Sequence, residues 1–144
     1  MSENIYEELR KDHEVQRTLL TELTETSGAT ADRKNLFSIL KKNLSDHAKY
    51  EERYFYAELM KEDITMEKAR HSVHEHHEID EQIEKLEETD FSSPQWLIQA
   101  KNLKDLVEHH LEEEEQEIFQ LSGKALSETQ KQNLGKAYHQ EMHV

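Results

Sequence analysis

The sequence predicts an all-α protein, an up-down-up-down four-helix bundle of two similar helical hairpins followed by a short C-terminal helix. Three observations support this fold class. One proline and three glycines among 144 residues leave room for long, rarely interrupted helices. Apolar residues recur three and four positions apart. The stretch HAKYEERYFY at His47 is echoed by HLEEEEQEIF at His110. The length fits one domain over residues 1–144.

Residues that start or stop helices divide the chain into its expected elements. These breaks are Ser27-Gly28, Asp63 to Thr65, Ser92-Ser93-Pro94 and Ser122-Gly123. They predict helices at residues 3–26, 32–62, 65–89 and 94–122. Ser93 can cap the fourth helix, and Pro94 has the backbone angle of a first turn. Ser127 opens the last helix, where Leu134 and Tyr138 are spaced to pack on the bundle.

Composition excludes several kinds of partner. The net charge of −14 opposes binding to nucleic acid or to an anionic membrane, and no apolar run is long enough to span a bilayer. The N-terminus lacks the pattern of a signal peptide, so we expect a cytoplasmic protein. The chain has no cysteine, so any metal must be held by nitrogen and oxygen atoms. The oligomeric state is not set by these features.

Two helices carry a polar pair inside their apolar stripe. In the second helix, steps of three and four residues place one set of side chains on one face. That set is Leu40, Leu44, His47, Glu51 and Phe55. A shift of 63 residues gives the matching set in the fourth helix, Leu103, Val107, His110, Glu114 and Ile118. Both pairs of histidine and glutamate should therefore point into the bundle.

The first and third helices add one histidine each. A shift of 64 residues aligns five positions of the two helices. It pairs Ile5, Leu9, His13, Val15 and Leu19 with Ala69, Val73, His77, Ile79 and Ile83. This alignment predicts that His13 and His77 point inward, and it places His76, the rival candidate, second. Six buried polar groups need a cation or one another, so a metal site competes with a hydrogen-bonded polar core or a pH-sensitive cluster.

The remaining histidines carry weaker evidence. Because 32 of the 144 residues are acidic, a histidine followed by an acid four residues later is common by chance. We therefore expect a solvated surface position for this second group. Its members are His71, His76, His109, His139 and His143.

The ligand types indicate which metal would bind. Four imidazoles and two carboxylates suit two ions with the glutamates bridging, and a set without sulfur favours iron or manganese over zinc. The ferritin-like di-iron bundles are the nearest competitor, but they use Glu-x-x-His pairs. No histidine of this chain has a glutamate three residues before it.

The order of motifs resembles the hemerythrin-like family, the hemerythrin HHE cation-binding domain. The matching stretches are DHEVQ, HAKYEERYFY, EHHEID and HHLEEEEQEIF. The resemblance implies a di-iron site of two iron ions with an oxo or hydroxo bridge. It also implies O₂, another diatomic molecule or a peroxide as the ligand. The implied metal ligands are His13, His47, Glu51, His77, His110 and Glu114.

The sequence departs from the O₂-carrying hemerythrins in two places. They have a second histidine four residues after the first on the third helix, where this chain has Glu81. They also have an aspartate five residues after the last histidine, where this chain has Glu114 after four. His74 and Glu81, one turn to either side of His77, are further candidate ligands.

Three large aromatic residues lie close to the predicted ligands. Phe55, Tyr56 and Phe119 either line a dry pocket beside the metals or simply fill the core, and packing is the commoner role at this spacing.

Three functions share this site. The first is binding or sensing of O₂ or a related small ligand. The second is an enzyme that acts on hydrogen peroxide or nitric oxide, and the third is an iron-handling or storage module. The ligands would be the same in all three, so the sequence alone does not separate them.

Overall fold

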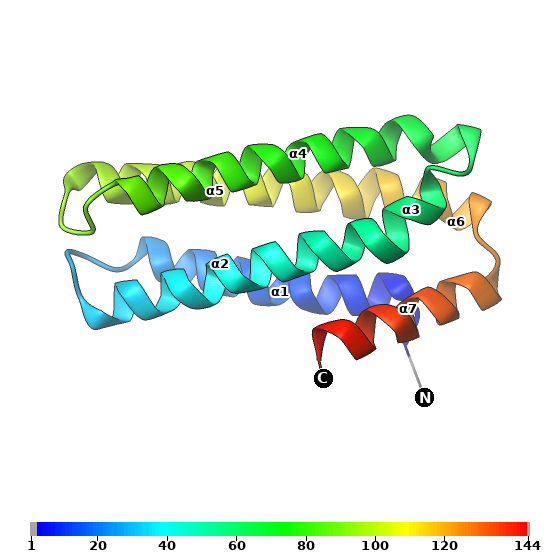
Figure 1. Cartoon of the computed structure of the whole chain (residues 1–144), viewed down its shortest axis with the longest axis horizontal. Helices are drawn as coiled ribbons and strands as arrows, with labels where there is room; N and C mark the ends of the chain where they lie inside the picture. The colour runs from blue at the N-terminus through cyan, green and yellow to red at the C-terminus, as the bar shows by residue number, and fades with distance from the viewer. Residues whose placement is uncertain (1–2, 144) are drawn as a thin grey trace.

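A computed structural model describes residues 3–143 and confirms the all-α bundle (Figure 1). The long helices are α1 (Ile5–Thr24), α2 (Ala31–Glu51), α4 (Asp63–Glu88) and α5 (Pro94–Glu113). The shorter ones are α3 (Ala57–Leu59), α6 (Phe119–Ala125) and α7 (Glu128–Met142). Two π-helical segments are η1 (Glu52–Tyr56) and η2 (Glu114–Ile118). No strand forms within residues 3–143.

The helix starts follow the local chemistry of the sequence. The side chain of Ser93 accepts a hydrogen bond from the backbone N–H of Gln95, and Pro94 opens α5 as expected. Ser127 and Gln130 form a reciprocal capping box at the start of α7. The predicted starts of these two helices are thereby confirmed.

The four long helices pack as two antiparallel hairpins. Helices α1 and α2 form the first hairpin, and α4 and α5 form the second (Figure 1). The hairpins pack through α1 on α5 and α2 on α4. Helix α7 runs back along the first hairpin and packs on α1 and α2. Each long helix therefore turns one face toward the bundle axis.

The apolar core is divided into two clusters. One lies toward the α1–α2 and α4–α5 connections and contains Leu20, Phe37, Leu86, Trp96 and Leu103 among others. The second lies toward α7 and contains Ile5, Phe55, Tyr56, Phe119 and Tyr138 among others. Buried histidines and glutamates occupy the helix positions between the two clusters. A polar layer thus interrupts the hydrophobic core partway along the bundle.

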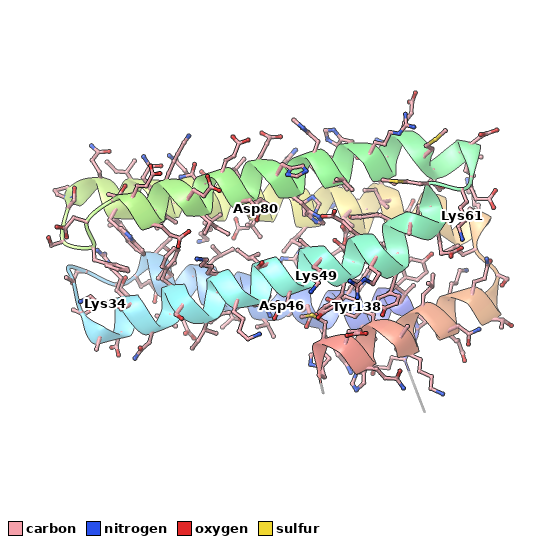
Figure 2. All side chains as sticks on the ribbon, in the orientation of Figure 1. Lys34, Asp46, Lys49, Lys61, Asp80 and Tyr138 are labelled. Carbon is pink, nitrogen blue, oxygen red and sulfur yellow. The ribbon has the colours of Figure 1, made fainter. Side chains whose placement is uncertain are left out.

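Helix α7 lies against the start of α1. A Cβ atom at Gly135 would lie 2.4 Å from the backbone oxygen of Glu3 and 2.7 Å from the backbone nitrogen of Ile5. Only glycine permits this approach. The contact brings Tyr138, which is fully buried, against the bundle (Figure 2). The packing expected of the last helix is confirmed.

Two π-helical turns replace the continuous helices expected at residues 32–62 and 94–122. The N–H of Ala57 bonds the carbonyl of Glu52, and the N–H of Phe119 bonds that of Glu114, each five residues back. The wider turn lets two consecutive side chains face inward, as Phe55 and Tyr56 do. Both π-helical turns immediately follow or begin at an inward glutamate.

Candidate metal centre

Six polar side chains meet between the two apolar clusters. Each of the four long helices contributes a histidine, while the glutamates come from the end of α2 and the start of η2. All six are at least 95 % buried. They are His13, His47, Glu51, His76, His110 and Glu114.

These side chains form two groups that share both glutamates. Within each group, one ligand atom per residue lies within 4.8 Å of the others. In the first, His13 Nε2 is 3.1 Å from Glu114 Oε1, and His47 Nε2 is 3.5 Å from Glu51 Oε2. Two imidazoles and two carboxylates thus surround one point.

The second group repeats the first across the bundle. His76 Nε2 is 3.1 Å from Glu51 Oε1, and His110 Nε2 is 3.5 Å from Glu114 Oε2. The Nε2 atoms of His76 and His110 are 3.1 Å apart. The equal spacing reflects the pseudo-two-fold relation between the hairpins. Each shared glutamate offers one oxygen atom to each group.

Five of the inward atoms have no hydrogen-bond partner within residues 3–143. His13 Nε2, His47 Nε2, both carboxylate oxygens of Glu51, and Glu114 Oε1 are buried without a hydrogen bond. Leaving so many polar atoms unpaired in a core is costly. Nitrogen and oxygen donors at this spacing are what two cations require, so the residues fit a two-metal centre.

Three histidines are held from behind by carboxylates. The Nδ1 atom lies 2.7 Å from Glu115 in His13, 2.7 Å from Glu52 in His76 and 2.9 Å from Glu75 in His110. An ionised carboxylate can only accept a hydrogen bond, so Nδ1 carries a proton and Nε2 is the nitrogen that faces the shared glutamates. This is how histidine ligands of metals are commonly oriented.

The fourth histidine uses a tyrosine instead. The Nδ1 atom of His47 donates to the hydroxyl of Tyr138, which in turn donates to the Asp12 carboxylate. Burial and the Asp12 charge raise the pKa of Tyr138, so the hydroxyl keeps its proton. Helix α7 thereby takes part in orienting a candidate ligand.

The cluster attracts positive charge. Burial opposes protonation of His47, but Glu51 and Asp12 outweigh it and raise its pKa to about 10. Likewise, Glu51 and Glu52 overcome burial at His76 and raise its pKa to about 9. Without a metal, protons on the imidazoles therefore supply the charge that the carboxylates demand.

The two shared carboxyl groups respond differently to their surroundings. Burial and the neighbouring Glu51 charge raise the pKa of Glu114. At Glu51, burial acts in the same direction, but His47 and His76 dominate and hold the pKa well below its usual value. Tyr56 also donates a hydrogen bond to Glu114. Two acids this close in a dry core are stable only with cations beside them.

The structure corrects the inward position on the third helix. His77 is exposed, whereas His76 is 5 % exposed and points into the cluster. The expectation that His77 faces inward and that His76 is a surface residue was wrong. The other five inward residues lie where the sequence analysis expected them.

The error came from the alignment between the first and third helices. A shift of 63 residues, already found for the other pair, aligns His13 with His76 and Asp12 with Glu75. It also aligns the buried Leu20 with Ile83. The shift of 64 used Val15, which is 46 % exposed. A slip of one residue rotates a helical side chain by about 100°.

The further candidates on the third helix do not reach the centre. His74 and Glu81 are both exposed, and His74 faces Glu78 at 3.4 Å. Both were candidate ligands because they lie one helical turn from His77, and like His77 they face away from the bundle axis. The exposed positions expected for the other histidines are confirmed, and these residues are His71, His109, His139 and His143.

The aromatic residues expected near the ligands do lie there. Tyr56 bonds Glu114 directly, and the Phe119 ring stacks on His13 with ring centroids 6.1 Å apart. Phe55 packs on Tyr56 and Phe119 from behind, within the core cluster. Tyr138, Glu52, Glu75 and Glu115 were not anticipated. The shift of 63 would have indicated the last three, because Glu52 aligns with Glu115 and Glu75 with Asp12.

A small cavity opens beside the centre between α2 and α4. It has room for a molecule of about the size of water. Three of the inward histidines line it together with apolar side chains and the amide of Gln16. The lining includes Gln16, Leu44, His47, His76, Ile79, Val107 and His110.

Fold and site together define a helical-bundle protein with a buried histidine and glutamate centre for cations. The model of the family described as hemerythrin HHE cation binding domain matches residues 4–122, and the chain belongs to this family. No helix within residues 3–143 has the length and apolar character needed to cross a bilayer.

A solved structure shares the fold. It is the crystal structure of a hemerythrin HHE cation binding domain-containing protein from Mycobacterium kansasii, with a TM-score of 0.88 and 23% identity. The match covers 97% of this chain and 85% of that one. Among curated proteins, none matches.

Proposed function

We propose that this chain is a non-haem di-iron protein that binds or senses O₂ or a related small ligand. The observation that carries the proposal is the pair of buried groups, each with two histidines, that share Glu51 and Glu114. His13 and His47 would hold one ion, and His76 and His110 would hold the other. Nitrogen and oxygen ligands without sulfur favour iron. A bound iron pair supplies redox chemistry toward O₂, peroxide or nitric oxide.

The cavity supports a small ligand. Leu44, Ile79 and Val107 give it apolar walls, and its size excludes anything much larger than a diatomic molecule. Apolar walls also limit the access of water to the ions. The chain therefore admits a small ligand to the centre and keeps larger molecules out.

Gln16 offers the cavity a hydrogen-bond donor. Its side chain is 1 % exposed, and its amide nitrogen has no hydrogen-bond partner among the described residues 3–143. Burying an amide N–H without a partner is costly, so a ligand that accepts this hydrogen bond is bound more tightly. We assign Gln16 the role of holding a polar ligand atom in the cavity.

Turnover of peroxide is the second candidate. Glu52 bonds His76 at 2.7 Å, yet its side chain is 37% exposed, so protons can pass between the solvent and this imidazole. The equivalent Glu115 is instead clamped by Arg17 at 3.0 Å. An enzyme that consumes peroxide needs such a route for protons.

Spectroscopy and O₂ measurement separate the two candidates. We expect the reduced, iron-loaded protein to give an oxygenated spectrum in air that disappears under argon, through several cycles. Sustained O₂ evolution from added hydrogen peroxide, abolished in Glu52→Gln, would instead establish the enzyme. His76→Ala should lose the spectrum, and His77→Ala, the matched control on the same helix, should keep it. A protein that holds iron but shows neither behaviour would contradict both candidates.

A further inference from the structure

A second group of histidines and glutamates lies on the outer face of the bundle between α4 and α5. His71 and Glu75 are one turn apart on α4, and His109 and Glu113 are one turn apart on α5. The two pairs face each other across the antiparallel helices. This outer cluster repeats the residue types of the buried centre but faces the solvent.

The spacing of the outer cluster matches metal coordination. His71 Nε2 lies 3.5 Å from Glu75 and 3.3 Å from Glu113, and His109 Nε2 lies 3.9 Å and 3.4 Å from the same two carboxylates. Ligand atoms bound tetrahedrally at 2.0–2.1 Å are separated by about 3.3 Å. The ligand atoms of His71, Glu75 and Glu113 all lie within 4.8 Å of one another, and both His71 contacts are within about 0.2 Å of that separation. The His109 nitrogen lies at the edge of this group, 3.9 Å from Glu75.

Hydrogen bonding does not account for the cluster. The four contacts do not form hydrogen bonds, although hydrogen bonds hold the buried histidines to their outer carboxylates. The side chains of Glu75 and Glu113 are only 11% and 14% exposed. Within residues 3–143, no lysine or arginine forms an ion pair with either carboxylate. Glu75 accepts a hydrogen bond from His110 through Oε1, which leaves its Oε2 and the Glu113 carboxylate facing the outer imidazoles.

We propose that His71, Glu75 and Glu113 form a separate site for a divalent transition-metal cation, with His109 beside it. Imidazole and carboxylate ligands that leave a position open suit zinc, and also ferrous iron or cobalt. A surface hollow lined by Glu67, His71 and Glu113 opens beside the cluster, so a hydrated cation can reach it.

One carboxylate joins the outer site to the buried centre. Glu75 Oε1 lies 2.9 Å from Nδ1 of His110, while Glu75 Oε2 faces the outer histidines His71 and His109. A cation on the outer site therefore lies two side chains from the buried ions.

Zinc titration of the iron-loaded protein tests the outer site. The full chain is saturated with ferrous iron under argon, separated from free metal and titrated with Zn²⁺ in a calorimeter. The double variant His71→Ala/His109→Ala is compared with His74→Ala/His77→Ala, which removes two exposed histidines of α4 outside the cluster. Elemental analysis of each sample gives the iron content.

The wild type and the control variant should each bind one equivalent of zinc. The His71→Ala/His109→Ala variant should bind this equivalent about 10–100-fold more weakly. The iron content should be the same in all three proteins. Equal zinc binding by all three proteins would overturn the proposal, as would loss of the equivalent in the control variant. If the buried centre holds no iron, zinc will fill it too. The predicted difference of one equivalent between the variants still stands, so this test does not depend on the proposed function.

Discussion

Replacing Gly135 with alanine tests how closely α7 must approach α1. Alanine is favoured over glycine within a helix by about 0.5–1 kcal/mol, so propensity alone predicts a more stable protein. Steric overlap predicts the opposite, because the new Cβ would lie 2.4 Å from the Glu3 carbonyl oxygen. Real Cβ contacts almost never fall below 3.0 Å, so the helices must separate.

We expect the steric overlap to outweigh the gain in helix propensity. The neighbouring atoms of Glu3, Asn4 and Ile5 belong to the backbone, so no change of side-chain rotamer can relieve the overlap. Overpacking of this kind costs about 1–3 kcal/mol, and the gain in helix propensity of about 0.5–1 kcal/mol offsets part of it, which leaves a net loss of up to about 2.5 kcal/mol. At about 2–4 °C per kcal/mol, the unfolding midpoint of Gly135→Ala should fall by up to roughly 10 °C.

Gly123 provides the matched control. It also lies in a helix, but a Cβ there would meet no atom of residues 3–143 within 4 Å. Gly123→Ala should therefore raise the free energy of unfolding by up to about 1 kcal/mol. Urea unfolding of both variants, followed by circular dichroism, gives the two changes. Equal or greater stability of Gly135→Ala relative to the wild type would refute the close packing of α7.

Three further predictions concern the centre and its cavity. Tyr138→Phe should keep the fold but weaken metal binding about 10–100-fold, measured by competition with a chelator, because His47 loses its hydrogen-bond acceptor. Gln16→Leu should retain iron and release a bound diatomic ligand about tenfold faster in stopped-flow experiments, since one hydrogen bond is lost; an unchanged rate would exclude this role. Removing metal with a chelator should lower the unfolding midpoint by roughly 5–10 °C in a thermal scan, because bound cations stabilise only the folded state.

The fold was predictable because helix signals are local. Ser93 and Ser127 mark helix starts through their own side chains, and the repeat of His47 with His110 fixed the phase of two helices. The rotation of the third helix was harder to predict, because its buried face includes the polar Ser72. The first helix, with which it was aligned, has the apolar Val15 on its exposed face.

Other features of the centre have no local signal. The π-helical turns lie directly after Glu51 and at Glu114, and no residue type that breaks a helix marks them in the sequence. The glutamates that contact the Nδ1 atoms of the histidines cannot be distinguished by sequence from the many other acidic residues of this chain. They are Glu52, Glu75 and Glu115. Tyr138 reaches its partners only because α7 docks through Gly135, a tertiary contact made far from His47 in the sequence.

Iron content per chain tests the central claim most directly. The protein is expressed in iron-replete medium, washed with a weak chelator and analysed for metals together with its concentration. The arrangement of two groups around Glu51 and Glu114 predicts two irons per chain. About one zinc and no iron per chain would contradict a di-iron centre.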